Sequence, residues 1–183
     1  MKLLLTISFL FFSLLPFNHE GIQPKKNSSF AQAPTVVYLV RHAEKANLTT
    51  DPELSESGKE RAKALMKILK AANINHVHST DYIRTRDTAE PTANAFGLTP
   101  EIYDPSNLKA LADRIREEGG NHVIVGHSNT TPKMVELLGG DPGSAIDDAS
   151  EFDRLYIVTI SGNNEVQTKI QTYGAAYTEN KKH

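Results

Sequence analysis

Residues 36–42 read VVYLVRH, which is five apolar β-forming residues followed at once by an arginine and a histidine. An unbroken apolar run of this kind is typical of a central parallel strand covered on both faces, since a surface strand would alternate in polarity. The two polar residues then lie at the carboxyl end of the strand, where open α/β sheets bind their ligands. This segment therefore predicts both the fold class and the position of the site.

The rest of the chain alternates between strand and helix patterns. Three short strands and one alternating edge strand are predicted, at residues 76–79, 122–125, 155–158 and 166–172. Helical spacing of apolar residues fills the intervals, with helices that begin near residues 57, 82, 108 and 131. Strands that alternate with helices form βαβ units, so we expect a three-layer α/β/α sandwich with a mostly parallel central sheet.

The composition is that of an ordinary globular protein of one domain. The chain has 183 residues, of which 39% are hydrophobic and 23% charged. Because it has no cysteine, disulfides, thiolate zinc sites and a cysteine nucleophile are excluded. The formal charge of −2 gives no global field for nucleic acid, so we expect no nucleic-acid partner and no membrane partner for the mature domain.

The amino-terminal segment is typical of an export signal. Lys2 precedes an uncharged, mostly apolar run over residues 3–17, shorter than the roughly 20 residues that a spanning helix needs. A small-residue cleavage pattern, AQA, follows at 31–33. We expect residues 1–33 to be a signal peptide of a periplasmic or secreted protein, with an uncleaved anchor as the alternative. Residues 34–177 would then form the folded domain, ahead of a flexible tail at 178–183.

Basic residues and histidines follow three of the predicted strands. Arg41 and His42 follow the first, Arg84 lies about a turn beyond the second, and His127 follows the third. Because the carboxyl ends of parallel strands meet at one edge of a sheet, we expect these four side chains to converge. Each alone is a common surface or structural residue. Together, two guanidinium groups and two imidazoles without matching carboxylates indicate an anion site, and phosphate fits it best.

Four segments that contain these residues resemble the signatures of the histidine phosphatase superfamily, also called the phosphoglycerate-mutase-like or acid-phosphatase fold. They occur in the family's order and read RHAE at 41–44, LSESG at 54–58, STDYIRTRDTA at 79–89 and GHS at 126–128. The sequence departs from the family pattern at Ala43 for glycine, Thr85 for alanine and Asp87 for glutamine. None of these changes removes a charged or nucleophilic group, although Ala43 would be strained if the backbone there had positive φ.

The resemblance implies a role for each residue of the cluster. His42 would be the nucleophile, attacking phosphorus through one ring nitrogen while a hydrogen bond holds the other. Arg41, Arg84 and His127 would bind the phosphoryl oxygens and neutralise charge during transfer. Asn47 aligns with a phosphate-binding position and is equally typical of a turn residue. The resemblance implies no metal and no cofactor.

The proton donor for the leaving group is the least defined part of the site. Family members commonly supply a carboxylate after the second signature helix or directly after the second histidine, and here Ser128 follows His127. The candidate is therefore Asp104, with Glu101 and Glu44 as weaker alternatives. A site without a strong acid would favour substrates with good leaving groups, such as phosphohistidine or acyl phosphates.

Other functions share parts of this pattern. Phosphoglycerate-mutase-type transfer and non-catalytic binding of phosphorylated ligands use the same residues, but the short interval between 96 and 121 indicates a small, open pocket that favours hydrolysis. Residues 126–130 nearly match the nucleophile elbow of serine hydrolases but lack its final glycine. His76 and His78 could bind a metal, and without a nearby third ligand they are typical of structural histidines.

The sequence thus favours a metal-independent phosphatase with a phosphohistidine intermediate on His42. Its expected partner is a small phosphorylated substrate or a phosphoprotein. The physiological substrate and the oligomeric state stay open at this point.

Overall fold

The computed structural model describes residues 33–176, which form a six-stranded sheet and four helices. The strands are β1 (Thr35–Arg41), β2 (His76–Ser79), β3 (Glu101–Ile102), β4 (Asn121–Gly126), β5 (Arg154–Ile160) and β6 (Val166–Thr172). The helices are α1 (Glu56–Leu69), α2 (Ile83–Ala95), α3 (Leu108–Glu118) and α4 (Thr130–Leu137). Within this part of the chain, no helix has the length and apolar character needed to span a bilayer.

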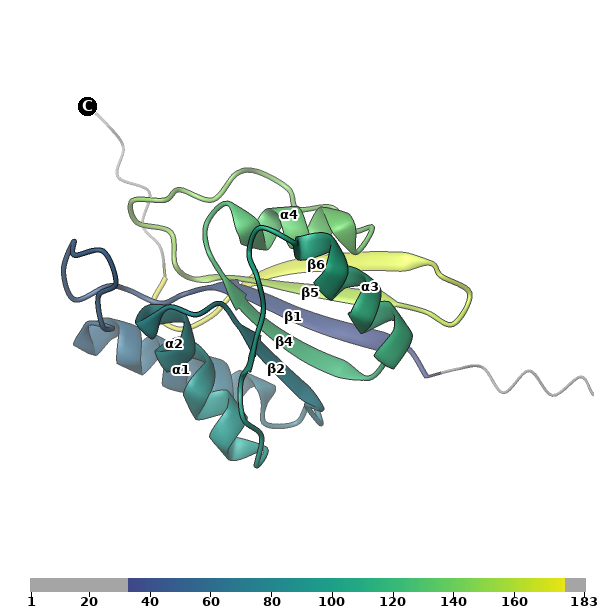
Figure 1. Ribbon diagram of the computed structural model, residues 1–183, viewed down its shortest axis with the longest axis horizontal. Helices are drawn as coiled ribbons and strands as arrows, with labels where there is room; N and C mark the ends of the chain where they lie inside the picture. Colours follow the sequence, from purple (N-terminus) through teal and green to yellow (C-terminus); the bar gives the residue numbers. More distant parts are fainter. Residues whose placement is uncertain (1–32, 177–183) are drawn as a thin grey trace, which may run out of the picture. The chain divides into compact units, whose positions relative to one another are not determined.

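The sheet is mixed, with a parallel part that carries the predicted strand ends. Its order is β3-β2-β4-β1-β5-β6. The strands β1, β2, β3 and β4 are parallel, whereas β5 pairs antiparallel with both β1 and β6. Figure 1 shows α1 and α2 on one face of this sheet and α3 and α4 on the other. The predicted three-layer α/β/α sandwich with a mostly parallel sheet is therefore confirmed.

The apolar run in β1 supplies both cores of the domain. Val37 and Leu39 pack in the core that includes α3 and α4, and Val40 packs in a second core with α1 and α2. Successive side chains of a strand point to opposite faces, so a strand covered on both sides is apolar throughout. Burial on both faces holds β1 in place, and with it the carboxyl end of the strand, where Arg41 and His42 lie.

The structure adds two features that the hydrophobic pattern does not reveal. β3 has only two residues, Glu101 and Ile102, which are too few for a recognisable strand pattern. β5 runs against β1 and continues into β6 through a short turn in which Asn164 has a φ of 64°. The expected signal peptide, apart from Ala33, and the expected tail lie outside the described residues.

Candidate active site

The strand register brings the two signature histidines together. β1 and β4 are adjacent and parallel, and their last residues, Arg41 and Gly126, are register partners. The His42 amide extends this pairing by donating to the Gly126 carbonyl oxygen over 2.9 Å. The rings of His42 and His127 then lie edge to face, with centroids 5.6 Å apart. The strand ends thus place both imidazoles in one site.

Two signature glycines are required by close packing. A Cβ on Gly126 would lie 2.9 Å from the hydroxyl of Tyr103, and a Cβ on Gly58 would lie 2.3 Å from the carbonyl oxygen of Glu44. Such contacts are too short for any side chain. Gly58 therefore allows the first turn of α1 to contact the backbone of the first signature directly.

The alanine at position 43 is accommodated without backbone strain. Ala43 is fully buried, and its φ is not positive. Its amide donates to Thr88 Oγ1 over 2.9 Å, and the same hydroxyl donates to the Arg84 carbonyl oxygen over 2.7 Å. A side chain of α2 thus supports the loop that carries His42.

His42 is buried and held as one tautomer. Its Nδ1 lies 2.8 Å from the carbonyl oxygen of Ala43. Because a carbonyl can only accept, the proton of the neutral ring is on Nδ1 and a lone pair is on Nε2. Burial, together with the charges of Arg41 and Arg84, lowers the pKa of His42 from 6.5 to about 3. The ring is therefore neutral at physiological pH, as nucleophilic attack requires.

Arg41 is buried, and residues 147–151 surround its guanidinium group. Nη1 donates to the carbonyl oxygens of Asp147 and Glu151 over 3.1 and 2.9 Å. Nη2 donates to the carbonyl oxygen and the carboxylate of Asp148 over 3.1 and 3.2 Å. The guanidinium carbon lies 4.1 Å from the centre of the Phe152 ring. Both terminal nitrogens are thus engaged, whereas the buried Nε–H has no partner among the described residues and remains for an anion.

Arg84 lies in the first turn of α2 and is held less firmly. Its Nη1 donates to Asp51 Oδ1 over 3.3 Å, and the same oxygen accepts the Ile83 amide over 2.9 Å. The guanidinium carbon lies 4.3 Å from the centre of the Tyr82 ring. Within residues 33–176, the buried Nε–H of Arg84 has no hydrogen-bond partner either. Arg41 and Arg84 line the same pocket, so a bound anion there would satisfy donors that the described residues leave without a partner.

His127 is oriented by a hydroxyl relay. Its Nε2 lies 3.0 Å from Thr80 Oγ1, and that hydroxyl donates to Thr85 Oγ1 over 3.0 Å. Thr80 therefore accepts the Nε2–H of His127. Burial, followed by the charges of Arg84 and Arg41, lowers the pKa of His127 to about 4. A bound phosphate dianion would offset those charges and favour the protonated, doubly donating ring.

These side chains line an open pocket of about 630 Å³. Lys45 adds a third cation to Arg41 and Arg84, and Asp148 is the one carboxylate among the described lining residues. Three cations against one anion suit a phosphate group better than a neutral ligand.

Two of the predicted site residues are not among the described residues that line this pocket, and their side chains bond to near neighbours in the sequence. Asp104 Oδ1 accepts from the amide and hydroxyl of Ser106 over 2.8 and 2.7 Å. Asn47 Oδ1 accepts from the amide and hydroxyl of Thr49 over 3.0 and 2.6 Å. The bonds from Ser106 lower the pKa of Asp104, so this exposed carboxylate is a poor proton donor. Ser106, the partner of Asp104, does line the pocket beside His42, so Asp104 is held one hydrogen bond away from the lining.

The weaker acid candidates also have other partners. Glu44 forms a two-oxygen ion pair with Arg61, at 2.8 to 3.0 Å. Arg61 further donates to the carbonyl oxygens of Tyr173 and Ala175 over 2.7 and 2.9 Å. Glu44 thus joins the first signature to α1 and to the segment after β6. Glu101 lies in β3, where it pairs with His76 and Arg114.

Asp148 is the pocket carboxylate that the sequence did not reveal. Its Oδ1 accepts from Ser128 Oγ and from Arg41 Nη2. The hydrogen bond from Ser128 and the charge of Arg41 lower the pKa of Asp148, so it is ionised at neutral pH. The Ser128 hydroxyl donates to a carboxylate rather than to a histidine, which does not support a serine nucleophile.

A separate histidine cluster lies at the amino end of β2, opposite the pocket. His76, His78 and His122 stack with centroid distances of 4.7 to 6.0 Å. Because arginine only donates, Arg114 Nη2 donates to His78 Nδ1 over 3.0 Å. His78 Nε2 then donates to His122 Nδ1 over 3.1 Å. The chain of bonds fixes both buried rings as neutral tautomers.

This cluster is built as a structural network. His122 Nε2 donates to the Gly119 carbonyl oxygen over 2.8 Å, so both of its ring nitrogens are hydrogen-bonded. The fold does bring a possible third metal ligand to this cluster. The carboxylate of Glu118 lies within 4.8 Å of ligand atoms of His76 and His122. A metal ion would have to displace an existing bond of His122, so the hydrogen-bonded interpretation accounts for the cluster best.

Comparison with known proteins supports a family for this arrangement. The model of the histidine phosphatase superfamily, branch 1, matches residues 37–106. The chain is also 30% identical over 128 residues to a curated protein of Photorhabdus laumondii subsp. laumondii named "Probable phosphoglycerate mutase GpmB". These matches support the histidine phosphatase superfamily for this chain. The match covers 66% of the chain and 58% of the relative, so the chain spans little more than half of that protein.

Solved structures of two phosphatases share the fold. The protein histidine phosphatase SixA, in complex with tungstate, has a TM-score of 0.58 at 17% identity, covering 76% of this chain and 96% of SixA. A mycobacterial glucosyl-3-phosphoglycerate phosphatase bound to inorganic phosphate has a TM-score of 0.54 at 16% identity, covering 78% and 98%. Members of the superfamily are phosphatases or mutases, and these likenesses extend the family assignment to the three-dimensional fold.

Proposed function

We propose that this superfamily member is a metal-independent phosphatase that forms a phosphohistidine intermediate on His42. The observation that carries the proposal is the hydrogen bond from His42 Nδ1 to the Ala43 carbonyl oxygen, which leaves a lone pair on Nε2. That nitrogen belongs to a pocket that also contains two guanidinium groups and a second histidine. A neutral nucleophile beside cationic phosphate ligands is the combination that phosphoryl transfer to histidine needs.

The proposed reaction has two steps. His42 Nε2 attacks phosphorus, and the bond from phosphorus to the leaving group breaks with its electron pair on the leaving group, which takes up a proton. The Nδ1–H stays on the Ala43 carbonyl oxygen and stabilises the positive ring. Water then attacks the phosphohistidine, the nitrogen–phosphorus bond breaks, and inorganic phosphate leaves. Arg41 Nε, Arg84 and His127 bind the phosphoryl oxygens in both steps.

The site favours substrates that need little help with the leaving group. Among the described pocket residues, the one carboxylate is Asp148, and its pKa is lowered rather than raised. A general acid for an alkyl phosphate needs a pKa near the working pH. The leaving groups of protein phosphohistidine, acyl phosphates and aryl phosphates depart more readily than an alkoxide. We propose these compounds as the preferred substrates.

Mutase chemistry is the competing proposal, because the curated relative carries a mutase name. A mutase must protect its phosphohistidine from water until the acceptor arrives. Here Lys45 and Asp148 on the pocket wall are exposed. Free access of water supports hydrolysis over transfer.

The test measures phosphate release in the presence of a metal chelator. Phosphoramidate and an aryl phosphate serve as substrates, and 3-phosphoglycerate serves as the mutase substrate. We expect phosphate release by the wild-type protein, no release by His42→Ala, and unchanged release by His76→Ala, which alters a histidine outside the pocket. Isomerised phosphoglycerate would establish the mutase instead. Tight phosphate binding without turnover would establish a non-catalytic binding protein.

We also propose that the protein is exported and that residues 1–33 direct the export. The apolar run after Lys2 and the AQA pattern at 31–33 support this proposal. Amino-terminal sequencing of material recovered from the periplasm or medium should begin at residue 34. A mature protein that starts at Met1 and fractionates with membranes would favour the uncleaved anchor.

A further inference from the structure

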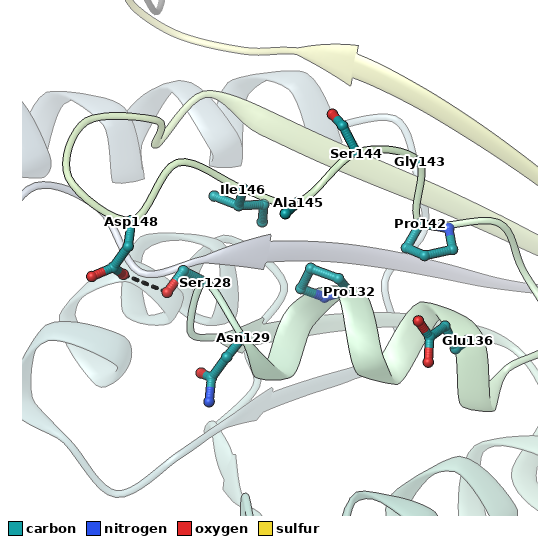
Figure 2. A pocket seen from close by; sticks show the side chains of 10 residues that line it. All are labelled: Ser128, Asn129, Pro132, Glu136, Pro142, Gly143, Ser144, Ala145, Ile146 and Asp148. Carbon is teal, nitrogen blue, oxygen red and sulfur yellow. Dashed lines mark hydrogen bonds between the residues drawn. The ribbon is translucent and has the colours of Figure 1, made fainter.

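A second groove adjoins the phosphate pocket. It measures about 520 Å³ and runs between α4 and residues 142–148, as Figure 2 shows. Ser128, Asn129 and Asp148 line both the groove and the phosphate pocket. The bond from Ser128 Oγ to the Asp148 carboxylate lies at this shared boundary. A substrate whose phosphoryl group lies in the first pocket can therefore extend into the second.

The two compartments have opposite charge. The phosphate pocket contains Arg41, Arg84 and Lys45. The described lining of the groove has no lysine, arginine or histidine and has two carboxylates, Asp148 and Glu136. These two carboxylates lie at opposite ends of the groove (Figure 2). A ligand that fits both compartments is anionic at one end and cationic at the other.

The wall opposite α4 is held in place by the sheet. Arg154 at the start of β5 donates to the carbonyl oxygen and hydroxyl of Ser144. Asp141 Oδ1 accepts the Gly143 amide over 2.9 Å, and Gly143 has a φ of 64° that favours glycine. Around these anchors the wall has apolar side chains, namely Pro142, Ala145 and Ile146. The groove is thus a formed surface with an apolar floor and charged ends.

The length of the groove suits an extended peptide. Glu136 follows Asn129 by seven residues along α4, a rise of about 10 Å. An extended chain covers this distance in roughly three residues. Glu136 pairs with Lys133 over 2.7 Å, but both side chains are about half exposed. Exposed pairs of this kind are weak, so a cation of the ligand can compete for Glu136.

We propose that this groove is a leaving-group subsite for an extended peptide that carries a lysine or arginine about three residues from the phosphorylated side chain. The proposal rests on the phosphatase function proposed above and adds the chemistry of its substrate. The basic side chain faces Glu136, and the intervening peptide lies on the apolar wall.

The test compares phosphohistidine peptides of equal length that differ in one residue. Lysine or glutamate occupies the third position before or after the phosphohistidine, and phosphoramidate is the small substrate that does not reach the groove. For the wild-type protein we expect kcat/KM to be about three- to tenfold higher for the better-placed lysine peptide than for its glutamate counterpart, since a single exposed pair contributes a few-fold. The preference should shrink in high salt because exposed charges are screened.

Charge reversal of Glu136 separates this proposal from the function itself. Glu136→Lys should abolish or invert the peptide preference while hydrolysis of phosphoramidate stays unchanged, and Glu136→Gln should reduce the preference. The matched control is Glu60→Lys, since Glu60 is also an exposed helical glutamate paired with a lysine three residues away. Equal rates for lysine and glutamate peptides, or a preference that survives Glu136→Lys, would overturn the subsite. Absence of phosphoramidate hydrolysis in the wild-type protein would instead overturn the phosphatase function.

Discussion

The Nδ1–H of His42 donates to the carbonyl oxygen of the next residue, Ala43, over 2.8 Å. A backbone group thus fixes the tautomer, whereas many catalytic histidines are oriented by a carboxylate. The orientation depends on the loop that Thr88 and Gly58 support, and not on the protonation of an acidic partner. Spectroscopy of the ring can test this directly.

His42 should stay neutral over the physiological pH range. Burial and the neighbouring cations lower its pKa from 6.5 to about 3, so its imidazole ¹⁵N shifts should report a constant Nδ1–H tautomer from about pH 5 to 8. The His42 signal is assigned by its loss in His42→Ala. Added phosphate should raise the pKa of the ring, because the dianion offsets the guanidinium charges. A midpoint near the ordinary histidine value in the free protein would contradict the burial argument.

Arg41 and Arg84 should differ in their effect on stability. Arg41→Lys should lower the free energy of unfolding by about 2–4 kcal/mol, because the buried Glu151 carbonyl oxygen and the part-buried carbonyl oxygens of Asp147 and Asp148 lose their donors. Arg84→Lys should cost less than about 1 kcal/mol, since its hydrogen bond is made with the partly exposed Asp51. Both variants should lower kcat/KM by roughly 100-fold or more, as expected when phosphoryl ligands are lost. Urea unfolding and steady-state kinetics measure the two effects separately, and equal destabilisation would refute the distinction.

Asp148→Asn should tighten the binding of inorganic phosphate. The Asp148 carboxylate accepts a hydrogen bond from Arg41 Nη2 and is ionised, so it repels a phosphate dianion bound in the pocket. Removing one negative charge from the pocket wall should lower the inhibition constant of phosphate by about three- to tenfold. Asp104→Asn is the control and should change it by less than about twofold, because this exposed carboxylate does not itself line the pocket and its hydrogen bonds are with Ser106 rather than with Arg41 or Arg84. Weaker phosphate inhibition in Asp148→Asn would show that the carboxylate supports the site instead.

The buried histidine network should make the protein sensitive to acid. Burial lowers the pKa of His78 to about 3 and also lowers that of His122. The unfolded chain binds protons near the ordinary value of about 6.5, so stability is full above that pH and is lost as pH falls toward 3. Protonation of His78 in the unfolded chain should by itself lower the free energy of unfolding by up to about 2 kcal/mol as the pH falls from roughly 6.5 to 5.

Replacing His78 checks this assignment. His78→Gln should flatten the acid limb of the unfolding free energy, measured by urea titration at several pH values. His76→Gln is the matched variant, because His76 is a half-exposed ring in the same stack, and it should leave the limb steep. An unchanged slope in His78→Gln would remove this residue from the acid response.

Glu44→Gln should separate stability from catalysis. The variant breaks a largely buried ion pair with Arg61, which should cost about 3 kcal/mol or more. Phosphoramidate hydrolysis at low temperature should stay within about threefold of wild type, since the carboxylate is engaged by Arg61 and does not line the pocket. Calorimetry and the phosphate assay measure the two outcomes. A large loss of activity only with poor leaving groups would reinstate Glu44 as the proton donor.

The parts of the fold that follow from local pattern could be predicted from the sequence. The apolar runs identify β1, β4 and β5, and the carboxyl ends of β1 and β4 locate Arg41, His42 and His127. Strand direction and the two-residue β3 could not be predicted, because pairing partners far along the chain determine them. Asp148 was missed for the same reason: its contact with Arg41 spans 107 residues and leaves no local signal.

For Asp104 and Asn47, the local sequence does contain a pattern that predicts where their side chains bond. Each stands two positions before a serine or threonine, Ser106 and Thr49, and bonds to the amide and hydroxyl of that residue. This spacing is typical of turns that an Asp or Asn side chain closes on its own backbone. Read in this way, the sequence indicates that both side chains are occupied locally.

The register between β1 and β4 links catalysis to the cooperativity of folding. The two strands lie at the centre of the sheet, and the pairing of Arg41 with Gly126 sets the spacing of the two histidines. Fraying of the outer strands β3 or β6 leaves this pairing intact, whereas loss of the pairing exposes both cores at once. On heating, the active-site geometry should therefore persist until the whole domain unfolds, and activity should not decline in advance of the structure.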